Sequence, residues 1–322
     1  MPAFLPDVPE VREDLADYFG EVMAFDAALG LLMKRLESIG ELDNTLLVVS
    51  GDHGAPGFPH GKCNLYDFGA SVPLAIRWGG AKGGRVVDDL TSLTDLAPTF
   101  LEVGGVKVPE VMTGRSLMPL LTSEKSGQIE PARDAVFIGR ERHVENARDG
   151  FLPYPQRAIR TADHLYIVNF KPERWPLGEP YRLDGDNPPP ANIAENTRVT
   201  LPDEDAGPTK AWLVSMRHDP KWKAHYEAAY GKRPREELYD LKSDPQQLKN
   251  VATDPVHAAA RAALEQRLMD ELKRTGDPRL VDDGKFFETP PMSGPVGNTD
   301  GEGGDVAPED LRRGRASARP AQ

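Results

Sequence analysis

A carboxylate and an imidazole stand side by side in the sequence SGDHG at positions 50–54. The apolar run LLVV at 46–49 precedes them and predicts a strand that is buried on both faces. In open α/β sheets ligands bind outside the carboxyl ends of the strands, so we expect Asp52 and His53 to face a binding site. The alternative is turn chemistry, in which Asp52 only accepts hydrogen bonds from backbone N–H groups. The two residues alone leave both interpretations open.

Two further groups of polar side chains follow. The loop 55–67 is rich in Gly and Pro and carries His60, Lys62 and Cys63, and irregular loops held on rigid strands often carry function. Arg142 and His143, with Arg140 close before them, form a second cluster. The plainer interpretation is a solvated loop lysine, a solvated charged edge and a small buried cysteine.

The elements that must position these residues alternate in type. The three-to-four residue spacing of apolar positions predicts a helix over Asp7–Gly40 that packs on a sheet, with Asp7 as its cap. A second strand is predicted over Val72–Trp78 and a short helix over Asp95–Val103. This order of helix, strand, strand and helix predicts an α/β architecture for residues 1–121.

The second half of the chain differs in its composition and in its predicted elements. Short strands with turns between them predict a small antiparallel sheet within residues 122–281, covered by one helix that ends at Gly276. The stretch Trp175–Lys210 is dense in Pro, Asp and Asn, and it predicts a long surface excursion. Residues 282–322 are rich in Gly, Pro and charge, so we expect a largely disordered tail.

Composition narrows the class of partner. The formal net charge of -12 argues against nucleic acid, because phosphate binding needs basic patches. The single cysteine excludes an internal disulfide framework. No apolar run reaches the roughly 18 residues that a membrane span needs, and residues 1–10 show no export signal. The sequence does not indicate an oligomeric state.

Several stretches together carry a family resemblance. They are DNTLLVVSGDHG, HGKCNLYDFGASVPLAIRWGG and GGRVVDDLTSLTDLAPTFLEVGGVKVPEVMTGRSLMPLL, followed by RHVENARDGFLPYPQRAIRTADHLYIVNFKPERWPLGEPY and ELYDLKSDPQQLKNVATDP. In this order they resemble the second half of a sulfatase, in the alkaline-phosphatase superfamily, and look most like the branch that contains heparan N-sulfatase. The resemblance implies an alkaline-phosphatase/sulfatase-like α/β sandwich that lacks its N-terminal part, with a small antiparallel C-terminal subdomain.

The resemblance also implies roles for individual residues. Asp52 matches a metal-binding aspartate, and His53 stands where many members have Asn, so both are expected to bind a divalent metal, calcium in most members. Lys62 matches a cation that binds the sulfate oxygens, over which the transferring group spreads its negative charge. Arg142 and His143 fall in a region near the substrate pocket. The implied substrate is a sulfate ester or N-sulfate on a saccharide.

One departure from the family pattern matters for activity. Sulfatases convert the Cys or Ser of a C/S-x-P-x-R motif to formylglycine, and residues 1–322 contain no such motif. Cys63 lacks the Pro and Arg and is not that nucleophile. We therefore expect the chain alone to be catalytically inactive, with formylglycine supplied only by a missing segment. A phosphodiester or phosphonate hydrolase of the same superfamily is one alternative, and a non-catalytic truncated or split gene product is another. Members are usually exported, periplasmic or lysosomal, and the sequence indicates no compartment.

Overall fold

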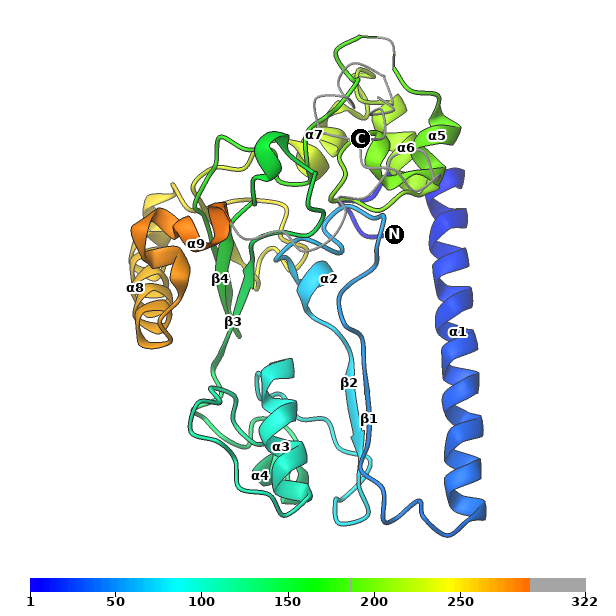
Figure 1. Ribbon diagram of the computed structural model, residues 1–322, viewed down its shortest axis with the longest axis vertical. Helices are drawn as coiled ribbons and strands as arrows, with labels where there is room; N and C mark the ends of the chain where they lie inside the picture. The colour runs from blue at the N-terminus through cyan, green and yellow to red at the C-terminus, as the bar shows by residue number, and fades with distance from the viewer. Residues whose placement is uncertain (186, 290–322) are drawn as a thin grey trace, which may run out of the picture.

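A computed structural model of the chain describes residues 1–185 and 187–289, and Figure 1 shows how its elements are arranged. Two strands form a ribbon near a long N-terminal helix, and four strands form a separate sheet. The helices and strands are α1 (Pro9–Ser38), β1 (Leu47–Ser50), α2 (Asp67–Ala70), β2 (Leu74–Arg77), α3 (Leu96–Val103), α4 (Met118–Thr122), β3 (Ala135–Arg140), β4 (Gln156–Thr161), β5 (His164–Asn169), α5 (Pro190–Glu195), α6 (Pro208–Ser215), α7 (Lys223–Tyr230), β6 (Glu236–Asp240), α8 (Ala258–Arg274) and α9 (Lys285–Glu288).

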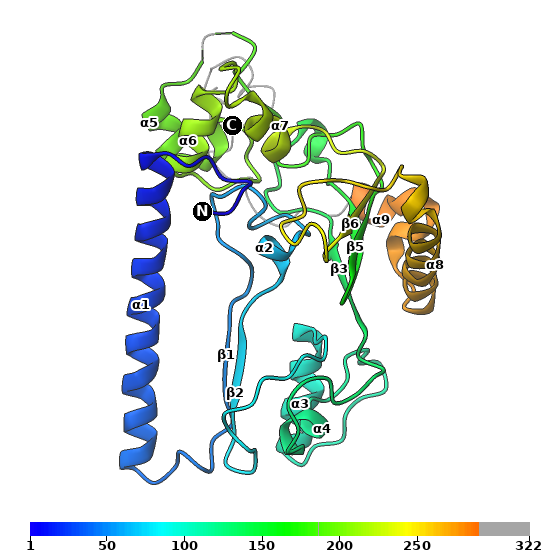
Figure 2. The ribbon, with the colours of Figure 1, turned by 180° about the vertical axis from the view of Figure 1, so that it is seen from behind.

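The long helix α1 forms where the apolar spacing predicts it, but it does not pack on a sheet. Val11 is its one buried residue among those described, and its main contact with another element is with α6 near its N-terminal end. Figures 1 and 2 show the rest of α1 running along one side of the molecule. Asp7 does not cap the helix, because its carboxylate accepts hydrogen bonds from the Arg12 guanidinium, at 2.5 and 2.8 Å. The predicted packing and the predicted cap are therefore wrong.

The ribbon consists of β1 and β2, which pair antiparallel with Val48 opposite Ile76. The prediction that β1 is buried on both faces is wrong here, since all four of its residues are only half-buried. The physical reason is that no other described strand pairs with either outer edge of the ribbon. The strand nonetheless ends immediately before Gly51, as the sequence predicts, and so delivers Asp52 and His53 at its carboxyl end.

The second sheet has the order β3-β4-β5-β6, and all its neighbours are antiparallel. Successive side chains of a strand point to opposite faces of this sheet. Ile159 and Tyr166 pack against α8, whereas Ala158 and Leu165 pack on the opposite face. The predicted small antiparallel sheet with one covering helix is thus present. The opposite face is covered by the loop that contains Leu65 and Tyr66, which couples this sheet to the candidate site.

Two expectations for the second half need correction. The stretch Trp175–Lys210 is not a surface excursion, because it includes α5 and contributes Leu177, Ile193 and Leu201 to a buried core shared with α6 and α7. Its many prolines begin helices and turns rather than marking disorder. The first residues of the expected tail are ordered, because 282–288 form a 3-10 turn and α9. The remainder of that expected tail, 290–322, lies outside the described residues.

Within the described ranges 1–185 and 187–289, no helix combines the length and the apolar character needed to cross a membrane.

Candidate functional site

The pair Asp52 and His53 lies just beyond the end of β1. Nδ1 of His53 lies 2.8 Å from the carbonyl oxygen of Gly54, and because a carbonyl only accepts, Nδ1 carries the hydrogen. Nε2 of His53 faces Oδ2 of Asp52 at 3.2 Å. Two acceptor atoms that face one another are satisfied either by a proton on Nε2 or by a shared cation. A backbone carbonyl that fixes the histidine tautomer is the usual support of a metal-binding imidazole.

Close backbone packing holds this corner in place. The N–H of Gly54 donates to the carbonyl of Gly69 in α2 at 2.9 Å. A Cβ atom at position 54 would lie 1.8 Å from the carbonyl oxygen of Phe68, so only glycine fits there. The backbone N–H of Lys62 donates to the carbonyl of Ala55 at 3.1 Å, which closes the intervening loop. The corner and the loop are therefore one folded unit, and its side-chain positions are set by main-chain contacts.

One cavity of about 760 Å³ brings the predicted residues together. Asp52, His53 and Lys62 line it from the ribbon and its loop, and Arg142 and His143 line it from the segment after β3. Residues roughly 80 positions apart in the sequence thus face the same space, because the loop around Leu65 packs on the four-stranded sheet. The structure places all five candidates at one site, although their roles stay predictions.

Lys62 does not stand alone in this cavity. Its Nζ lies 3.0 Å from Oδ2 of Asp205, and both side chains are mostly buried. The backbone carbonyl of Asp205 also lies near Gly57, so the 203–207 segment packs along the loop. Asp205 is a residue that sequence reasoning missed, since it falls in the stretch interpreted as a surface excursion. The one sequence signal for Asp205 was the acidic run Asp203–Asp205. Such a run does not indicate a buried site unless its arginine and lysine partners are known.

A buried cluster of charged side chains packs against the loop that carries Lys62. Asp203 is fully buried and bonds Arg140 through Nη2 at 2.5 Å and Arg148 through Nη2 at 2.7 Å. Burial by itself would raise the pKa of Asp203, but Arg148 and Arg140 outweigh it and hold that pKa below its usual value. Arg140 also donates to the carbonyl oxygen of Cys63 at 2.6 Å. Arg140 therefore ties β3 to the residue next to Lys62.

Cys63 itself adopts a left-handed backbone conformation within the loop. Its backbone φ is 69°, a left-handed value that is uncommon for a residue with a Cβ atom. Burial raises the pKa of its thiol to about 12, with Arg140 opposing the shift, so the thiol stays protonated near neutral pH. A protonated thiol is a poor nucleophile, which agrees with the sequence argument that Cys63 does not perform the chemistry.

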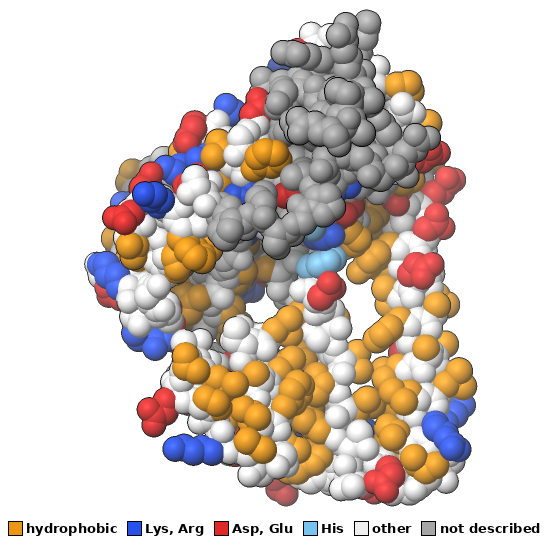
Figure 3. All heavy atoms as spheres, in the orientation of Figure 1, with side chains coloured by type: hydrophobic (Ala, Val, Ile, Leu, Met, Phe, Trp, Pro, Cys, Tyr) orange, Lys and Arg blue, Asp and Glu red, His pale blue; other side chains and the backbone are white. Residues whose placement is uncertain are grey.

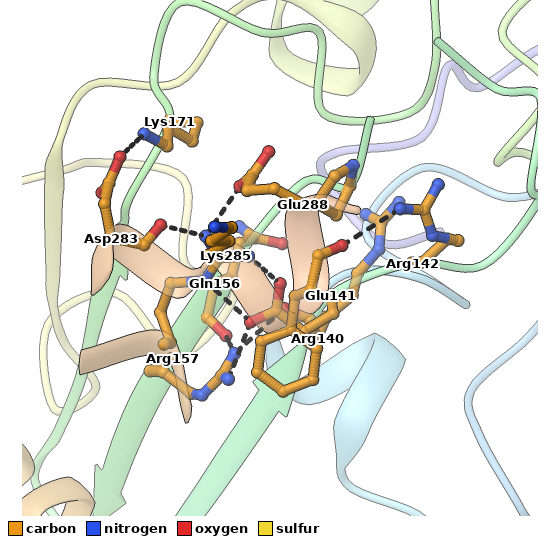
Figure 4. A network of polar contacts seen from close by, with 12 residues as sticks. Arg140, Glu141, Arg142, Gln156, Arg157, Lys171, Asp283, Lys285 and Glu288 are labelled. Atoms are coloured by element: carbon orange, nitrogen blue, oxygen red, sulfur yellow. Dashed lines mark hydrogen bonds and ion pairs between the residues drawn. The ribbon is translucent and has the colours of Figure 1, made fainter. Parts of the chain in front are cut away.

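Arg142 and His143 line the same cavity in different ways. The Arg142 guanidinium donates to the carbonyl oxygens of Phe151 and, at 3.2 Å, of Phe287 next to the C-terminal end of α9. Arg157 and Arg279 both donate to Glu141, and Arg279 also donates to Glu288. Figure 4 shows Arg142 beside this polar network. Burial lowers the pKa of His143, an effect that Asp203 opposes and Lys62 reinforces, so a neutral imidazole is favoured. Arg142 fastens the α9 segment at this edge of the cavity.

His60 plays a packing role two residues before Lys62. Its ring stacks between Phe4, at 4.6 Å between centroids, and Tyr66, at 4.2 Å. The hydroxyl of Tyr66 donates to Glu237 of β6 at 2.7 Å, so this stack links the N-terminal residues to the sheet. Burial, reinforced by the charge of Arg233, lowers the pKa of His60 to about 3.

We expect the buried His60 to make the folded protein less stable as the pH is lowered. The folded-state pKa lies below the unfolded value of about 6.5, so the contribution is complete above that pH and is lost as the pH falls toward 3. Between about pH 7 and pH 5 this group alone should remove about 2 kcal/mol of unfolding free energy. Urea unfolding at both pH values checks this. His60→Asn should flatten the difference, and the exposed His218→Asn should not; equal pH dependence in the two variants would contradict the assignment.

The donor set bears on the metal that the resemblance implies. Asp52 and His53 offer a carboxylate oxygen and a ring nitrogen on facing atoms, which fits two ligands of a divalent cation. No group of three or more His, Cys, Asp or Glu side chains within the described part of the chain is placed to hold a metal. Calcium takes about 6–8 oxygen ligands, so a cation bound here would need ligands beyond this pair.

Comparisons with known proteins support this fold. Residues 2–106 match the sulfatase family. N-sulphoglucosamine sulphohydrolase of Homo sapiens is 31% identical over 297 residues, which cover 86% of this chain and 51% of that protein. A structure solved with its substrate D-glucosamine-2-N,6-O-disulfate has a TM-score of 0.54 and 24% identity, over 82% of this chain and 40% of its own. The phosphonate monoester hydrolase of Agrobacterium radiobacter has a TM-score of 0.52 and 25% identity, over 82% of this chain and 42% of its own.

The chain is therefore a relative of the sulfatases, with the alkaline-phosphatase-like α/β fold of that family. The resemblance predicted from the sequence is confirmed, as is the fold class. The chain spans about half the length of the human relative, and 41% of an ulvan-active sulfatase of Formosa agariphila that it also matches.

Proposed function

We propose that this chain carries the metal-binding and sulfate-binding part of a hydrolase that acts on a sulfated saccharide. The observation that carries the proposal is the cavity that Lys62, held by Asp205, lines together with the Asp52–His53 pair. A fixed cation beside two metal-ligand candidates is the arrangement that an anionic sulfuryl group requires. Further support comes from the human sulphohydrolase relative and from the structure solved with a disulfated glucosamine.

Each residue has a distinct role in this proposal. Asp52 and His53 would hold a divalent cation, which the family resemblance implies to be calcium, and a bound cation polarises sulfate oxygens. Lys62 pairs with the negative charge of the sulfate group, while Asp205 fixes the position of the lysine Nζ. The neutral His143 lines the same cavity and can donate or accept one hydrogen bond there. We propose that turnover needs a formylglycine nucleophile, whose motif residues 1–322 do not contain.

A phosphonate or phosphodiester hydrolase is the second candidate. The Agrobacterium phosphonate monoester hydrolase shares the fold, and a lysine beside a cation site suits a phosphonate oxygen as well as a sulfate oxygen. The sulfated saccharide stands first because the human relative, at 31% identity, is a sulphohydrolase.

Competition between two ligands tests the choice. We expect the chain, with calcium present, to bind D-glucosamine-2-N,6-O-disulfate at least tenfold more tightly than phenyl phosphonate, as measured by isothermal titration calorimetry. Desulfated glucosamine is the control for binding through the sugar alone. Tighter binding of the phosphonate would transfer the proposal to the second candidate, and equal binding of glucosamine would remove the sulfate from it. No release of sulfate is expected from this chain alone, and sustained release would contradict the need for the missing nucleophile.

A further inference from the structure

Among the residues that the structure describes, one cation of the candidate cavity has no carboxylate partner. The other described arginine and lysine side chains that line this cavity form ion pairs: Lys62 with Asp205, Arg140 with Asp203 and Arg160 with Asp67. Arg142 lines the same cavity, and its hydrogen bonds within 1–185 and 187–289 all go to backbone carbonyl groups. A guanidinium stays charged near neutral pH, so Arg142 brings a positive charge to the cavity that no ion pair cancels.

The carboxylates nearest to Arg142 are already engaged by other arginines. Asp203, Glu288 and Glu141 are close enough to oppose the effect of burial, which lowers the pKa of Arg142. Each of these carboxylates pairs with two other arginines: Asp203 with Arg140 and Arg148, Glu288 with Arg174 and Arg279, and Glu141 with Arg157 and Arg279. Their negative charge is therefore balanced elsewhere and does not neutralise Arg142.

Three backbone carbonyl groups fix the orientation of the Arg142 guanidinium. It donates to the carbonyl oxygen of Phe151, to that of Phe287 at 3.2 Å and to that of Glu145 at 3.4 Å. These contacts use at most three of its five N–H donors, so donors remain for a ligand. A guanidinium held in one orientation suits an oxyanion, because a carboxylate or a sulfate can accept two parallel hydrogen bonds from it.

The segment that supplies the Phe287 carbonyl is itself anchored by ion pairs. We call residues 277–288, which include α9, the α9 segment. Its Glu288 accepts hydrogen bonds from Arg174 at 2.8 Å and from Arg279 at 2.7 Å. Arg279 is only 2% exposed, and its Cζ lies 5.5 Å from the centre of the Phe287 ring. Figure 4 shows Glu288 and Arg142 in this region, and Figure 3 shows charged side chains of both signs gathered over α8 and α9. The network therefore holds one acceptor of Arg142 in a fixed place.

We propose that Arg142 binds a second anionic group of the saccharide and that the α9 segment positions Arg142 for this role. The inference rests on the proposed function, because the first anionic group is the sulfate that pairs with Lys62. The second group is an oxyanion, either another sulfate or the carboxylate of an adjoining sugar acid, and both accept the paired hydrogen bonds of a guanidinium. The substrate class is then a saccharide that carries at least two anionic groups.

Calorimetric titration with three ligands tests this second subsite. With calcium present, the full chain is titrated with D-glucosamine-2-N-sulfate, with D-glucosamine-2-N,6-O-disulfate, and with a disaccharide that joins glucuronic acid to the N-sulfated glucosamine. We expect at least one of the two doubly charged ligands to bind about tenfold more tightly than the singly charged one. Arg142→Gln should remove this increase and leave the affinity for the N-sulfate unchanged, which also shows that the variant is folded. The ligand that loses affinity in Arg142→Gln identifies the second group as sulfate or carboxylate.

Two further variants separate positioning from overall charge. Glu288→Gln keeps Arg142 but weakens the anchoring of the α9 segment, so it should remove part of the increase, about threefold, and leave the affinity for the N-sulfate unchanged. Arg274→Gln is the matched control for charge, because Arg274 is exposed on α8 and does not line the cavity. It should keep the full increase, since an exposed charge at a distance is largely screened by salt.

The contradicting results are distinct from one another. Equal affinity of the unaltered chain for all three ligands, or an increase that Arg142→Gln retains, would overturn the second subsite. An increase that Glu288→Gln retains in full would overturn the positioning role of the α9 segment. Binding of the N-sulfate without any increase would leave the proposed function standing, whereas no binding of any of the three ligands would overturn the proposed function as well.

Discussion

Replacing Asp203 by alanine should lower the free energy of unfolding by about 3–5 kcal/mol, because it leaves two buried guanidinium groups without their carboxylate. Arg140 and Arg148 are both almost completely buried and both bond the same oxygen of Asp203. The N–H of Val144 also donates to Asp203, at 2.8 Å, so the backbone beside His143 loses its acceptor too. Urea unfolding followed by circular dichroism measures the change.

The exposed pair Lys223–Glu227 provides the control for Asp203. Glu227→Ala removes an ion pair on the surface of α7, so it should change stability by no more than about 1 kcal/mol. The lowered pKa of Asp203 adds a pH signature: its stabilisation is complete above the ordinary carboxyl pKa and is lost as the pH falls through the lower, folded value. Asp203→Ala should therefore cost much less at strongly acidic pH. Similar losses in Asp203→Ala and Glu227→Ala would show that the cluster does not support the loop.

The second large effect concerns Lys62. Lys62→Ala should weaken binding of D-glucosamine-2-N,6-O-disulfate about 10–100-fold, as expected when a charge-assisted hydrogen bond to an anion is lost. Part of the loss arises because Asp205, freed from its partner at 3.0 Å, then repels the sulfate. Calorimetric titration measures the affinity, and Lys62→Arg should restore part of it because the positive charge is retained.

The control for Lys62 is a lysine that does not line this cavity. Lys82→Ala changes the net charge by the same amount, and Lys82 lies in an exposed loop. It should leave the affinity within about twofold, because an exposed charge at a distance is largely screened by salt. An equal loss in both variants would mean that Lys62 acts only through the overall charge of the chain.

Local sequence patterns were sufficient to predict the corner at the end of β1. An apolar run that stops at SGDHG defines both a strand end and the position of Asp52 and His53 just beyond it. The family resemblance then predicted roles for Lys62, Arg142 and His143, and the structure places these residues around one cavity. Short-range chemistry and motif order were enough for these residues because backbone geometry near a strand end depends on few contacts.

Long-range partners could not be predicted in the same way. Asp203 and Asp205 acquire their meaning only through Arg140, Arg148 and Lys62, which are more than 50 residues away in the chain. A Pro- and Asp-rich segment looks like a loop when its buried Leu and Ile residues are sparse, so its core was missed. The packing of α1 was mispredicted for a different reason: periodicity identifies an apolar face but does not identify the element that covers it.

We propose that Asp52 and His53 bind a cation that acts together with Lys62 on one sulfated ligand. Calorimetric titration of D-glucosamine-2-N,6-O-disulfate, with and without calcium, into the unaltered chain and Asp52→Asn tests it most directly. We expect calcium to raise the affinity of the unaltered chain at least tenfold and to have little effect on Asp52→Asn. The same calcium dependence in both proteins, or an affinity that calcium does not change in either, would contradict the claim.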